Sequence, residues 1–313
     1  MSNMIATRDA YGETLAELGG ENKDIVVLDA DLSGSTKTGV FAKKFPERFF
    51  NMGIAEANMV GTAAGLAAAG KIPFVSTFAI FAAGRAWEQI RQSVAYPKAN
   101  VKIVPTHGGI TVGEDGGSHQ SVEDIAIMRA IPNMTVIVPA DGPETKLAIR
   151  AAAAHKGPVY IRLGRNKVPT VFDDGYRFEI GKGVEVAAGT DLTFVTTGLM
   201  TAQAVTAAGL LKKEGVSARV VHIATIKPLD QEIILKAARE TGAIVTAEEH
   251  SVIGGLGGAV AELLSEKHPV TVKRVGINDR FGTSGKAEEL LKYFGLTPQD
   301  LVEAARETLA GKR

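Results

Sequence analysis

The residues best suited to acid–base chemistry gather in one polar stretch, 107–120, which reads HGGITVGEDGGSHQ. Within it, His107 and His119 stand on either side of the acids Glu114 and Asp115, and the stretch is rich in glycine. Imidazole and carboxylate groups accept, donate or relay protons near neutral pH, and glycine lets a backbone approach a ligand closely. The stretch predicts a catalytic or ligand-binding loop. The alternative is a flexible surface loop whose histidines only form hydrogen bonds.

The flanking segments would position this loop at the edge of a sheet. Residues 101–106 (VKIVPT) form an apolar run of strand length, and the segment after the loop predicts a helix. Ser121 can cap that helix, and Glu123 and Asp124 suit its first turn because acids interact favourably with the helix dipole there. Open α/β sheets place ligands in loops that follow the carboxyl ends of their strands.

Two arginines occupy comparable positions elsewhere in the chain. Arg8 lies in the first turn of a helix predicted at 7–18 with Thr7 as its cap, and Arg165 ends a strand predicted at 158–165. A cation at a helix start or a strand end suits an anionic ligand. Arg8 is therefore either a ligand-binding residue or a solvated surface arginine.

Acids and hydroxyls follow earlier strands. Asp31 and Ser35 lie in a turn rich in small hydroxyl residues after a strand predicted at 24–29, where they either cap the turn or touch a ligand. Glu56 interrupts the apolar start of a helix predicted at 53–70. A carboxylate there is either exposed beside the helix dipole or buried with a partner, because an unpaired buried charge is costly.

Aromatic residues mark the next strand-to-helix corner. A strand is predicted at 72–76 and a helix at 77–96, with Phe78 and Phe81 at the junction between them. Such rings usually belong to the core, but at a corner they could also stack on a flat ligand.

Composition narrows the class of protein. The chain has 313 residues, 45% of them hydrophobic, which indicates about two domains with sizeable cores. Lys+Arg and Asp+Glu both number 35, so no basic face predicts nucleic acid binding. The absence of cysteine excludes disulfides and thiolate chemistry and is compatible with a cytoplasmic location. No apolar run approaches ~18 residues, so we expect no membrane span.

Strands and helices alternate in both halves of the sequence. This alternation predicts an α/β fold of two doubly wound domains with mostly parallel sheets, because parallel strands need crossover helices. We expect the first domain at 1–168, a linker rich in Pro, Gly and Asp at 169–187, and a smaller domain at 188–313. His222 and His250 are predicted to be structural, and the glycines of 254–258 (GGLGG) are predicted to allow tight helix packing. No metal-ligand spacing is present, so no metal site is assigned to this chain.

Several motifs occur together in the order of one known family. They are ATRDA, DADLSGS, GIAEANM, STFAIF, HGGITVGEDGGSHQSVED, IPNM and RLGRN. The chain resembles the transketolase family of thiamine diphosphate enzymes over its whole length, but only as the C-terminal half of a full-length transketolase. The resemblance implies a pyrimidine-binding domain followed by a transketolase C-terminal domain.

The resemblance also implies roles for the residues around the cofactor. Glu56 matches the glutamate that binds the pyrimidine ring nitrogen of thiamine diphosphate and favours the imino tautomer. Phe81 matches the aromatic residue that stacks on the pyrimidine, with Phe78 lining the same pocket. Asp31 matches an acid near the thiazolium side.

A second set of matches concerns the sugar. His107 and His119 match histidines that contact sugar hydroxyls and the reacting carbonyl, which makes them catalytic candidates beside Glu56. Asp115 matches an aspartate that binds a sugar hydroxyl. The sugar phosphate is implied to lie among Arg8, Ser35 and Arg165.

One motif of thiamine enzymes is absent. The family binds Mg²⁺ (or Ca²⁺) and the diphosphate through a GDG motif and a later Asn, and this chain has no GDG. The resemblance therefore implies a split transketolase, in which a separate N-terminal subunit carries GDG, binds most of the metal and pairs with this chain as α2β2. The implied reaction moves a two-carbon ketol unit between sugar phosphates, as in the pentose phosphate pathway.

Other functions fit part of the pattern. The β subunit of a 2-oxoacid dehydrogenase shares GIAE and GGLGGAV but does not need His107, Asp115 and His119 together. The C-terminal part of deoxyxylulose-phosphate synthase is a further relative, and specialised transketolases for unusual sugars share these motifs. A non-catalytic scaffold subunit is the alternative from another class.

Overall fold

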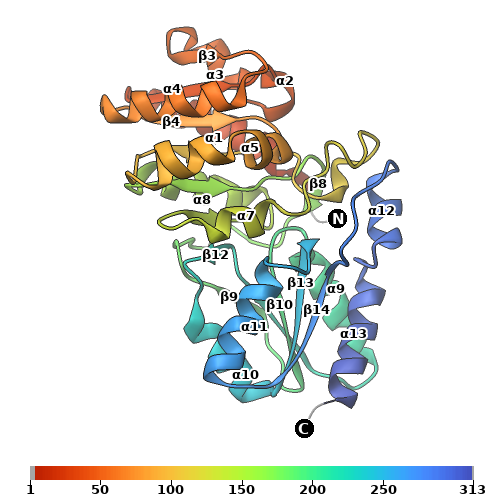
Figure 1. The fold of residues 1–313 in the computed structure, drawn as a ribbon. Coiled ribbons are helices and arrows are strands. Elements are labelled where there is room, and N and C mark those ends of the chain that lie inside the picture. The colour runs from red at the N-terminus through yellow and green to blue at the C-terminus, as the bar shows by residue number, and fades with distance from the viewer. Residues whose placement is uncertain (1–3, 312–313) are drawn as a thin grey trace.

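Two β-sheets with helices packed on them make up the computed structural model, which describes residues 4–311 (Figure 1). The seven-stranded sheet belongs mainly to the first half of the chain, and the five-stranded sheet to the second half. Parallel pairs dominate both sheets. The predicted α/β fold class is confirmed.

The first sheet has the strand order β12-β6-β7-β5-β4-β2-β3. Its strands are β2 (Ile25–Asp29), β3 (Phe49–Asn51), β4 (Ile72–Ser76), β5 (Lys102–Ile103), β6 (Thr135–Ile137), β7 (Val159–Ile161) and β12 (Thr225–Lys227). Side chains alternate between its faces with the period of two expected of a strand. In β2, Val26 and Leu28 join one apolar cluster, and Ile25 and Val27 join another. Both faces of this sheet are therefore buried under helices.

Helices from the first half cover these two faces. They are α1 (Thr7–Glu21), α2 (Ser33–Thr36), α3 (Gly39–Lys44), α4 (Glu56–Ala68), α5 (Ala79–Arg85), α6 (Trp87–Gln89), α7 (Asp124–Ala130) and α8 (Gly142–Ala154). Residues of α4, α5 and α7 pack in one cluster, and residues of α1, α3 and α8 pack in the other. Asp141 begins α8 by accepting a hydrogen bond from the backbone N–H of Glu144 at 2.9 Å, as an N-cap should.

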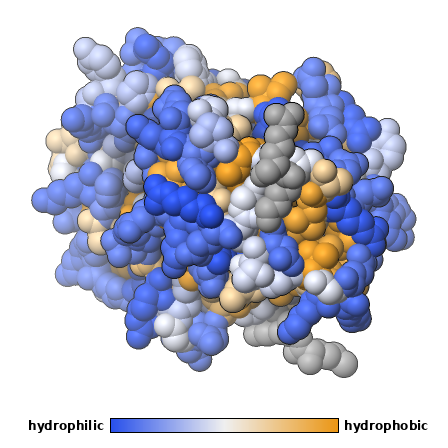
Figure 2. All heavy atoms as spheres, turned by 90° about the horizontal axis from the view of Figure 1, so that it is seen from below, coloured by the Kyte–Doolittle hydropathy of each residue, from blue (hydrophilic) through white to orange (hydrophobic). Residues whose placement is uncertain are grey.

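The second sheet has the order β14-β13-β10-β11-β9. Its strands are β9 (Val184–Ala187), β10 (Leu192–Thr196), β11 (Ala218–His222), β13 (Ala243–Ser251) and β14 (Thr271–Ile277), with β9 antiparallel. Its helices are α9 (Met200–Lys213), α10 (Gln231–Thr241), α11 (Leu256–Lys267), α12 (Ala287–Tyr293) and α13 (Pro298–Ala310). On the face seen from below, hydrophilic residues cover much of the surface, and apolar residues gather right of its centre (Figure 2).

Strand β12 crosses between the two halves of the fold. Although it follows the second domain's β11 in sequence, it pairs antiparallel with β6 of the first sheet, with Thr225 opposite Ile137. A small two-stranded sheet joins β1 (Met4–Ala6) to β8 (Lys167–Pro169). The linker expected at 169–187 and the domain boundaries around it stay predictions.

Four local expectations are wrong. Thr7 and Ser121 were expected to cap helices, but neither side chain caps one: α1 begins after Ala6, and α7 begins after Glu123. The helix expected at 53–70 begins only at Glu56, because Gly53, with a φ of 68°, and Ala55, with a φ of −143°, are not helical. The helix expected at 77–96 breaks at Ala86 into α5, α6 and a π-helical turn at Ile90–Ala95.

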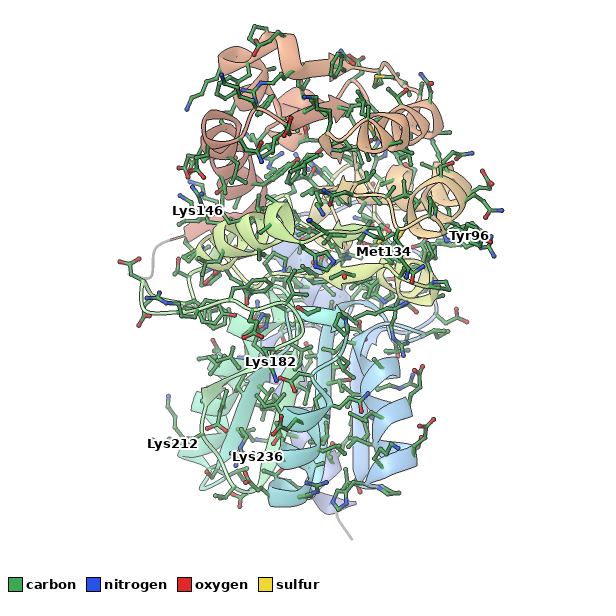
Figure 3. The ribbon with its side chains drawn as sticks, turned by 90° about the vertical axis from the view of Figure 1, so that its left-hand side faces the viewer. Tyr96, Met134, Lys146, Lys182, Lys212 and Lys236 are labelled. Carbon is green, nitrogen blue, oxygen red and sulfur yellow. The ribbon has the colours of Figure 1, made fainter. Side chains whose placement is uncertain are left out.

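The outer surface carries most of the charged side chains. Lys146, Lys182, Lys212 and Lys236 are on the outside of the ribbon, and Tyr96, which is 80% exposed, points away from it (Figure 3). Among residues 4–311, no helix combines the length and apolarity needed to cross a bilayer.

Candidate active site

The polar loop 107–120 lies beyond β5, where the sequence places it. His107 has a positive φ of 60°, and Gly108 donates a backbone hydrogen bond to Leu163 beyond β7. A short 3₁₀ turn at Ile110–Val112 leads into the acidic part of the loop. The loop therefore joins the carboxyl ends of neighbouring parallel strands, which is the ligand-binding edge of such sheets.

Four rings meet at this edge. The ring of His107 stacks on Phe78 with centroids 3.8 Å apart, and Phe78 lies nearly parallel to Phe81 at 5.8 Å. His119 turns its edge toward both phenyl rings, at 6.1 Å from Phe78 and 5.5 Å from Phe81. Two predicted catalytic histidines and two predicted cofactor-binding rings thus form one cluster.

The surroundings of His107 favour the neutral form of its imidazole. It is 2% exposed, and its pKa is lowered from 6.5 to about 3, first by burial and then by the charges of Arg8, Arg165 and His119. Its Nε2 lies 3.4 Å from Arg8 Nη1, and its Nδ1 lies 2.7 Å from Thr106 Oγ1. Because a guanidinium only donates, Nε2 is the acceptor and Nδ1 carries the proton. His107 therefore presents an unprotonated Nε2 to the arginine side of the site.

This neutral histidine makes the stability of the chain depend on pH. Below pH 6.5 the unfolded chain binds a proton at His107 that the folded chain binds only near pH 3. The stability contributed by His107 is therefore complete above pH 6.5 and is lost as the pH falls toward about 3. We expect the free energy of unfolding to fall less between about pH 7.5 and pH 5 in His107→Asn than in the wild type, measured by urea denaturation. Equal pH slopes would contradict this assignment.

Two arginines approach each other beside His107. Arg8 donates from Nη1 to the carbonyl oxygen of Ser35 at 3.0 Å, and Arg165 donates to the carbonyl oxygen of Val112. Burial, partly offset by Asp9, and the nearby charge of Arg165 lower the pKa of Arg8, so the two guanidinium groups repel each other. Arg8 Nε is buried without a hydrogen-bond partner among the described residues. An anion placed between the two groups would relieve the repulsion and supply acceptors.

Arg165 also faces the acids of the loop. Its Nη1 lies 3.8 Å from Glu114 Oε2 and 3.7 Å from Asp115 Oδ2. The side chain of Asp115 is 39% exposed, so it can reach a ligand as well as the arginine. Ser35 was expected beside the sugar phosphate. In the structure its backbone carbonyl oxygen accepts a hydrogen bond from Arg8.

Glu56 begins α4 and is buried, with only 4% of the residue exposed. Its Oε1 accepts a hydrogen bond from Arg85 Nη1 at 2.9 Å, and no hydrogen bond to Oε2 is present within residues 4–311. The guanidinium of Arg85 also lies over the ring of Phe81, 4.3 Å from its centroid. Glu56 is thus linked to the ring cluster through Arg85, a residue that the sequence reasoning missed. The spacing of Phe81 and Arg85, four residues apart on one helix, was the available signal.

Asp31 is exposed in the turn after β2 and has a positive φ of 65°. Asn51 donates a hydrogen bond to its Oδ1 at 2.8 Å. The turn is held by Asp29, a buried acid that accepts from the backbone of Leu32 and from the hydroxyls of Thr36 and Thr38. Asp31 and Ser35 are therefore placed by a neighbour that the sequence reasoning did not identify. Within residues 4–311, Asp31 forms its side-chain hydrogen bond with Asn51 and makes no hydrogen bond or ion pair with the ring cluster.

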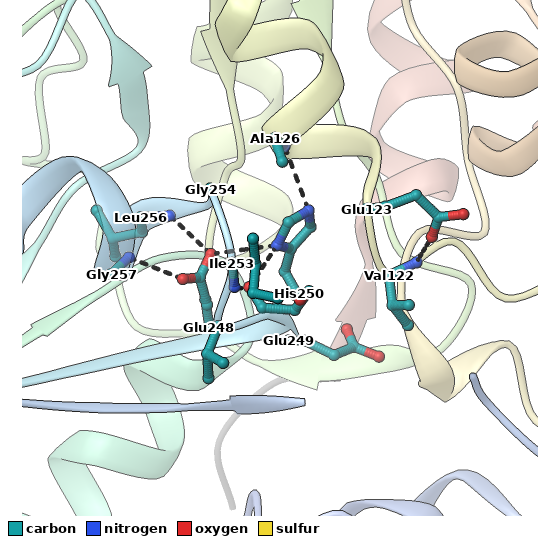
Figure 4. A network of polar contacts seen from close by, with 12 residues as sticks. Val122, Glu123, Ala126, Glu248, Glu249, His250, Ile253, Gly254, Leu256 and Gly257 are labelled. Carbon is teal, nitrogen blue, oxygen red and sulfur yellow. Dashed lines mark hydrogen bonds and ion pairs between the residues drawn. The ribbon is translucent and has the colours of Figure 1, made fainter. Parts of the chain in front are cut away.

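The other predicted structural residues behave as expected. His222 lies 2.8 Å from Glu144 and 2.7 Å from Thr201. His250 accepts a hydrogen bond from the backbone of Ala126, as Figure 4 shows. The start of α11 is filled by the carboxylate of Glu248, which accepts backbone hydrogen bonds from Leu256 and Gly257 (Figure 4). The GGLGG segment therefore leaves no room for a phosphate at this helix start. Among residues 4–311, no cluster of three or more His, Asp or Glu residues is placed to hold a metal ion.

In comparisons with known proteins, two family models match consecutive parts of the chain. The family model for the transketolase pyrimidine-binding domain matches residues 3–170, and that for the transketolase C-terminal domain matches residues 181–301. A relative from Methanocaldococcus jannaschii, described as a transketolase C-terminal section, is 56% identical over 305 residues and 96% of each chain. A 6-deoxy-6-sulfo-D-fructose transketolase subunit of Clostridium sp. is 45% identical over 97% of this chain and 95% of its own.

A solved structure is similar over the full length. It is a split-gene transketolase in the form of an inactive β4 tetramer, with 58% identity and a TM-score of 0.93, covering 99% of this chain and 100% of its own.

Proposed function

This chain belongs to the transketolase family, and on that premise we propose that it is the C-terminal subunit of a two-chain transketolase dependent on thiamine diphosphate. The proposed reaction moves a two-carbon ketol unit from a ketose phosphate to an aldose phosphate, as in the pentose phosphate pathway. The observation that carries the proposal is the juxtaposition of the buried carboxylate of Glu56 with the rings of Phe81, His119 and Phe78.

The residues around Glu56 fit the pyrimidine of the cofactor. Glu56 Oε2 is not hydrogen-bonded within residues 4–311, so it can share a proton with a ring nitrogen. Phe81 is half-buried and offers an aromatic surface to a flat heterocycle. When bound, thiamine diphosphate supplies the nucleophilic carbon and the electron sink for the reaction. Glu56, Phe78 and Phe81 would hold its pyrimidine, and Asp31 would lie toward the thiazolium.

The remaining residues would act on the sugar. His107 would accept a hydrogen bond from a sugar hydroxyl at its unprotonated Nε2, and His119 would relay a proton at the reacting carbonyl. Asp115 would accept a hydrogen bond from a second hydroxyl. Arg8 and Arg165 would bind the phosphate, assisted by Ser35, because paired guanidinium groups bind such oxygens with charge-assisted hydrogen bonds.

The proposed function requires a partner subunit that binds the metal ion and the diphosphate. Mg²⁺ prefers oxygen ligands such as carboxylates and carbonyls, and the sequence of this chain carries no GDG motif. We propose that a separate N-terminal subunit supplies that motif, binds most of the Mg²⁺ (or Ca²⁺), and forms an α2β2 assembly with this chain. The inactive β4 state of the similar split-gene transketolase supports this requirement for a partner.

The partner requirement gives a direct test. We expect this chain alone, supplied with thiamine diphosphate and Mg²⁺, to show no transfer from xylulose 5-phosphate to ribose 5-phosphate. Addition of a GDG-bearing N-terminal subunit should start the transfer, because the diphosphate site is then complete. Turnover can be followed by the aldehyde product and assembly by sedimentation. Activity from the chain by itself would refute the split-subunit proposal.

The same assay can identify the donor sugar if further donors are tested. The relative from Clostridium acts on a sulfonated ketose according to its description, so 6-deoxy-6-sulfo-D-fructose should be tested beside the sugar phosphates. Transfer from that donor but not from the sugar phosphates would support ketol transfer and assign a sulfonated sugar as the substrate. Oxidative decarboxylation of a 2-oxoacid, without ketol transfer, would instead favour the dehydrogenase alternative.

A further inference from the structure

The C-terminal domain reaches the polar loop directly. The chain after β14 rises from the second sheet toward α12, beside the first domain (Figure 1). Residues 282–284 of this segment pack against residues 116–120, which include His119. The loop of the first domain is therefore shaped in part by a segment more than 160 residues away in sequence.

Gln120 is the residue through which the two segments meet. It follows His119 and is 2% exposed. Its Nε2 lies within hydrogen-bond distance of three carbonyl oxygens, those of Ile110 at 3.1 Å, Gly113 at 3.1 Å and Thr283 at 2.9 Å, which share its two N–H groups. One side-chain amide thus links residues 110–113 and the end of the loop to the C-terminal domain.

Glycine is required on the facing side of this contact. A Cβ at Gly282 would lie 1.7 Å from Gln120 Oε1 and 2.8 Å from its Cδ, so any side chain at 282 would displace Gln120. A Cβ at Gly117 would lie 2.7 Å from the carbonyl oxygen of Gly282, and the Cβ of any residue replacing Gly116 would lie 2.5 Å from Ser284 Oγ. Glycine therefore lets the backbone of 116–117 and 282 approach the side chains of Ser284 and Gln120 and, between Gly117 and Gly282, the facing backbone.

The same contact determines where His119 lies. The carbonyl oxygen of Gly116 accepts hydrogen bonds from the backbone N–H groups of His119, at 2.9 Å, and Gln120, at 3.2 Å. Gly116 has a φ of 75°, which few other residues adopt. A shift of Gln120 or Gly116 would consequently move the imidazole away from the rings of Phe78 and Phe81.

We propose that residues 282–284 of the C-terminal domain position His119 for the reaction, which makes Gln120 and Gly282 positioning residues; this inference rests on the proposed function. Neither residue is required to touch the substrate. The C-terminal domain thereby contributes to turnover through the conformation of a loop in the other domain.

The test uses Gly282→Ala in the assembly with the N-terminal subunit. We expect kcat for ketol transfer to fall by about 10- to 100-fold, because small displacements of catalytic groups are costly. The Kd for thiamine diphosphate should change by much less than kcat, since of the residues around the cofactor only His119, which lies edge-on to Phe81, is displaced. Gly209→Ala is the matched control: it makes the same change in the same domain, where a Cβ would meet nothing within 4 Å.

A double-mutant cycle separates positioning from general damage. In a Gln120→Ala background the two atoms nearest to a new Cβ at position 282, Oε1 and Cδ, are gone and only the Cβ of residue 120 remains, at 3.1 Å. Adding Gly282→Ala there should lower kcat by less than about threefold. Gln120→Met, which keeps the length of the side chain but loses its hydrogen bonds, should lower kcat without preventing assembly. An effect of Gly282→Ala within twofold of wild type, or an equal loss in both backgrounds, would overturn the proposal.

A readout without turnover completes the test. Hydrogen exchange of the His119 and Gln120 amides in the intact chain should accelerate in Gly282→Ala but not in Gly209→Ala. If the wild-type assembly transfers no ketol unit from any sugar, the proposed function fails, whereas unchanged amide exchange in Gly282→Ala would refute the loop contact itself.

Discussion

Glu56→Gln in the assembled enzyme is expected to lower kcat by about 100- to 10,000-fold, the range for loss of a group that shares a proton during the reaction. Glutamine keeps the size of the side chain and can still accept a hydrogen bond from Arg85, so folding and assembly should persist. It cannot share a carboxyl proton with a ring nitrogen. The loss should therefore appear in turnover rather than in stability.

Steady-state kinetics with the N-terminal subunit present would measure this effect, and sedimentation would show that the assembly forms. Glu266→Gln is the control, because it makes the same change at an exposed position near the end of α11. A scaffold subunit would lose nothing when Glu56 is changed. A kcat within twofold of wild type would thus leave Glu56 without a chemical role and favour the non-catalytic alternative.

Substitution of Arg8 or Arg165 by glutamine should weaken transfer from phosphorylated sugars specifically. A hydrogen bond to a charged group contributes about 1.5–3 kcal/mol, so each change should lower kcat/KM by roughly 10- to 150-fold. An unphosphorylated ketose has no phosphate for these guanidinium groups to bind. Its kcat/KM should change much less, although Arg8 also contacts His107.

The ratio of kcat/KM for the phosphorylated and unphosphorylated donors is the quantity to measure. Arg150→Gln provides a control, because Arg150 forms ion pairs with Glu17 and Glu21 on the outer surface. An equal loss with both donors would indicate that the arginines support the loop and do not bind phosphate. A loss confined to the phosphorylated donor would support their proposed role.

Local sequence patterns predict the parts of the site that lie near one another in the chain. The loop 107–120 follows a strand as expected, and the strand-to-helix corner brings Phe78 beside Phe81. The alternation of apolar strand-length runs with helical segments was sufficient to predict the α/β class. These features depend on neighbours within a few residues, which sequence periodicity records directly.

Contacts between distant segments were not predictable in the same way. Thr7 can cap a helix by propensity, but its hydroxyl instead accepts a hydrogen bond from the backbone of Gly164, 157 residues away. The Gln120 contact with Thr283 and the Glu56 contact with Arg85 likewise depend on how separate elements pack. Propensity is a weak preference that tertiary contacts override.

The crossing of β12 into the first sheet has a practical consequence for shortening the gene. Truncation after the first domain would remove Thr225–Lys227 and leave the edge of β6 that faces away from β7 unpaired at Val136 and Ile137. An open edge of this kind invites strands of other molecules, so the shortened product would be prone to self-association. The two halves are thus bound together by shared main-chain pairing, and recombinant versions should retain both.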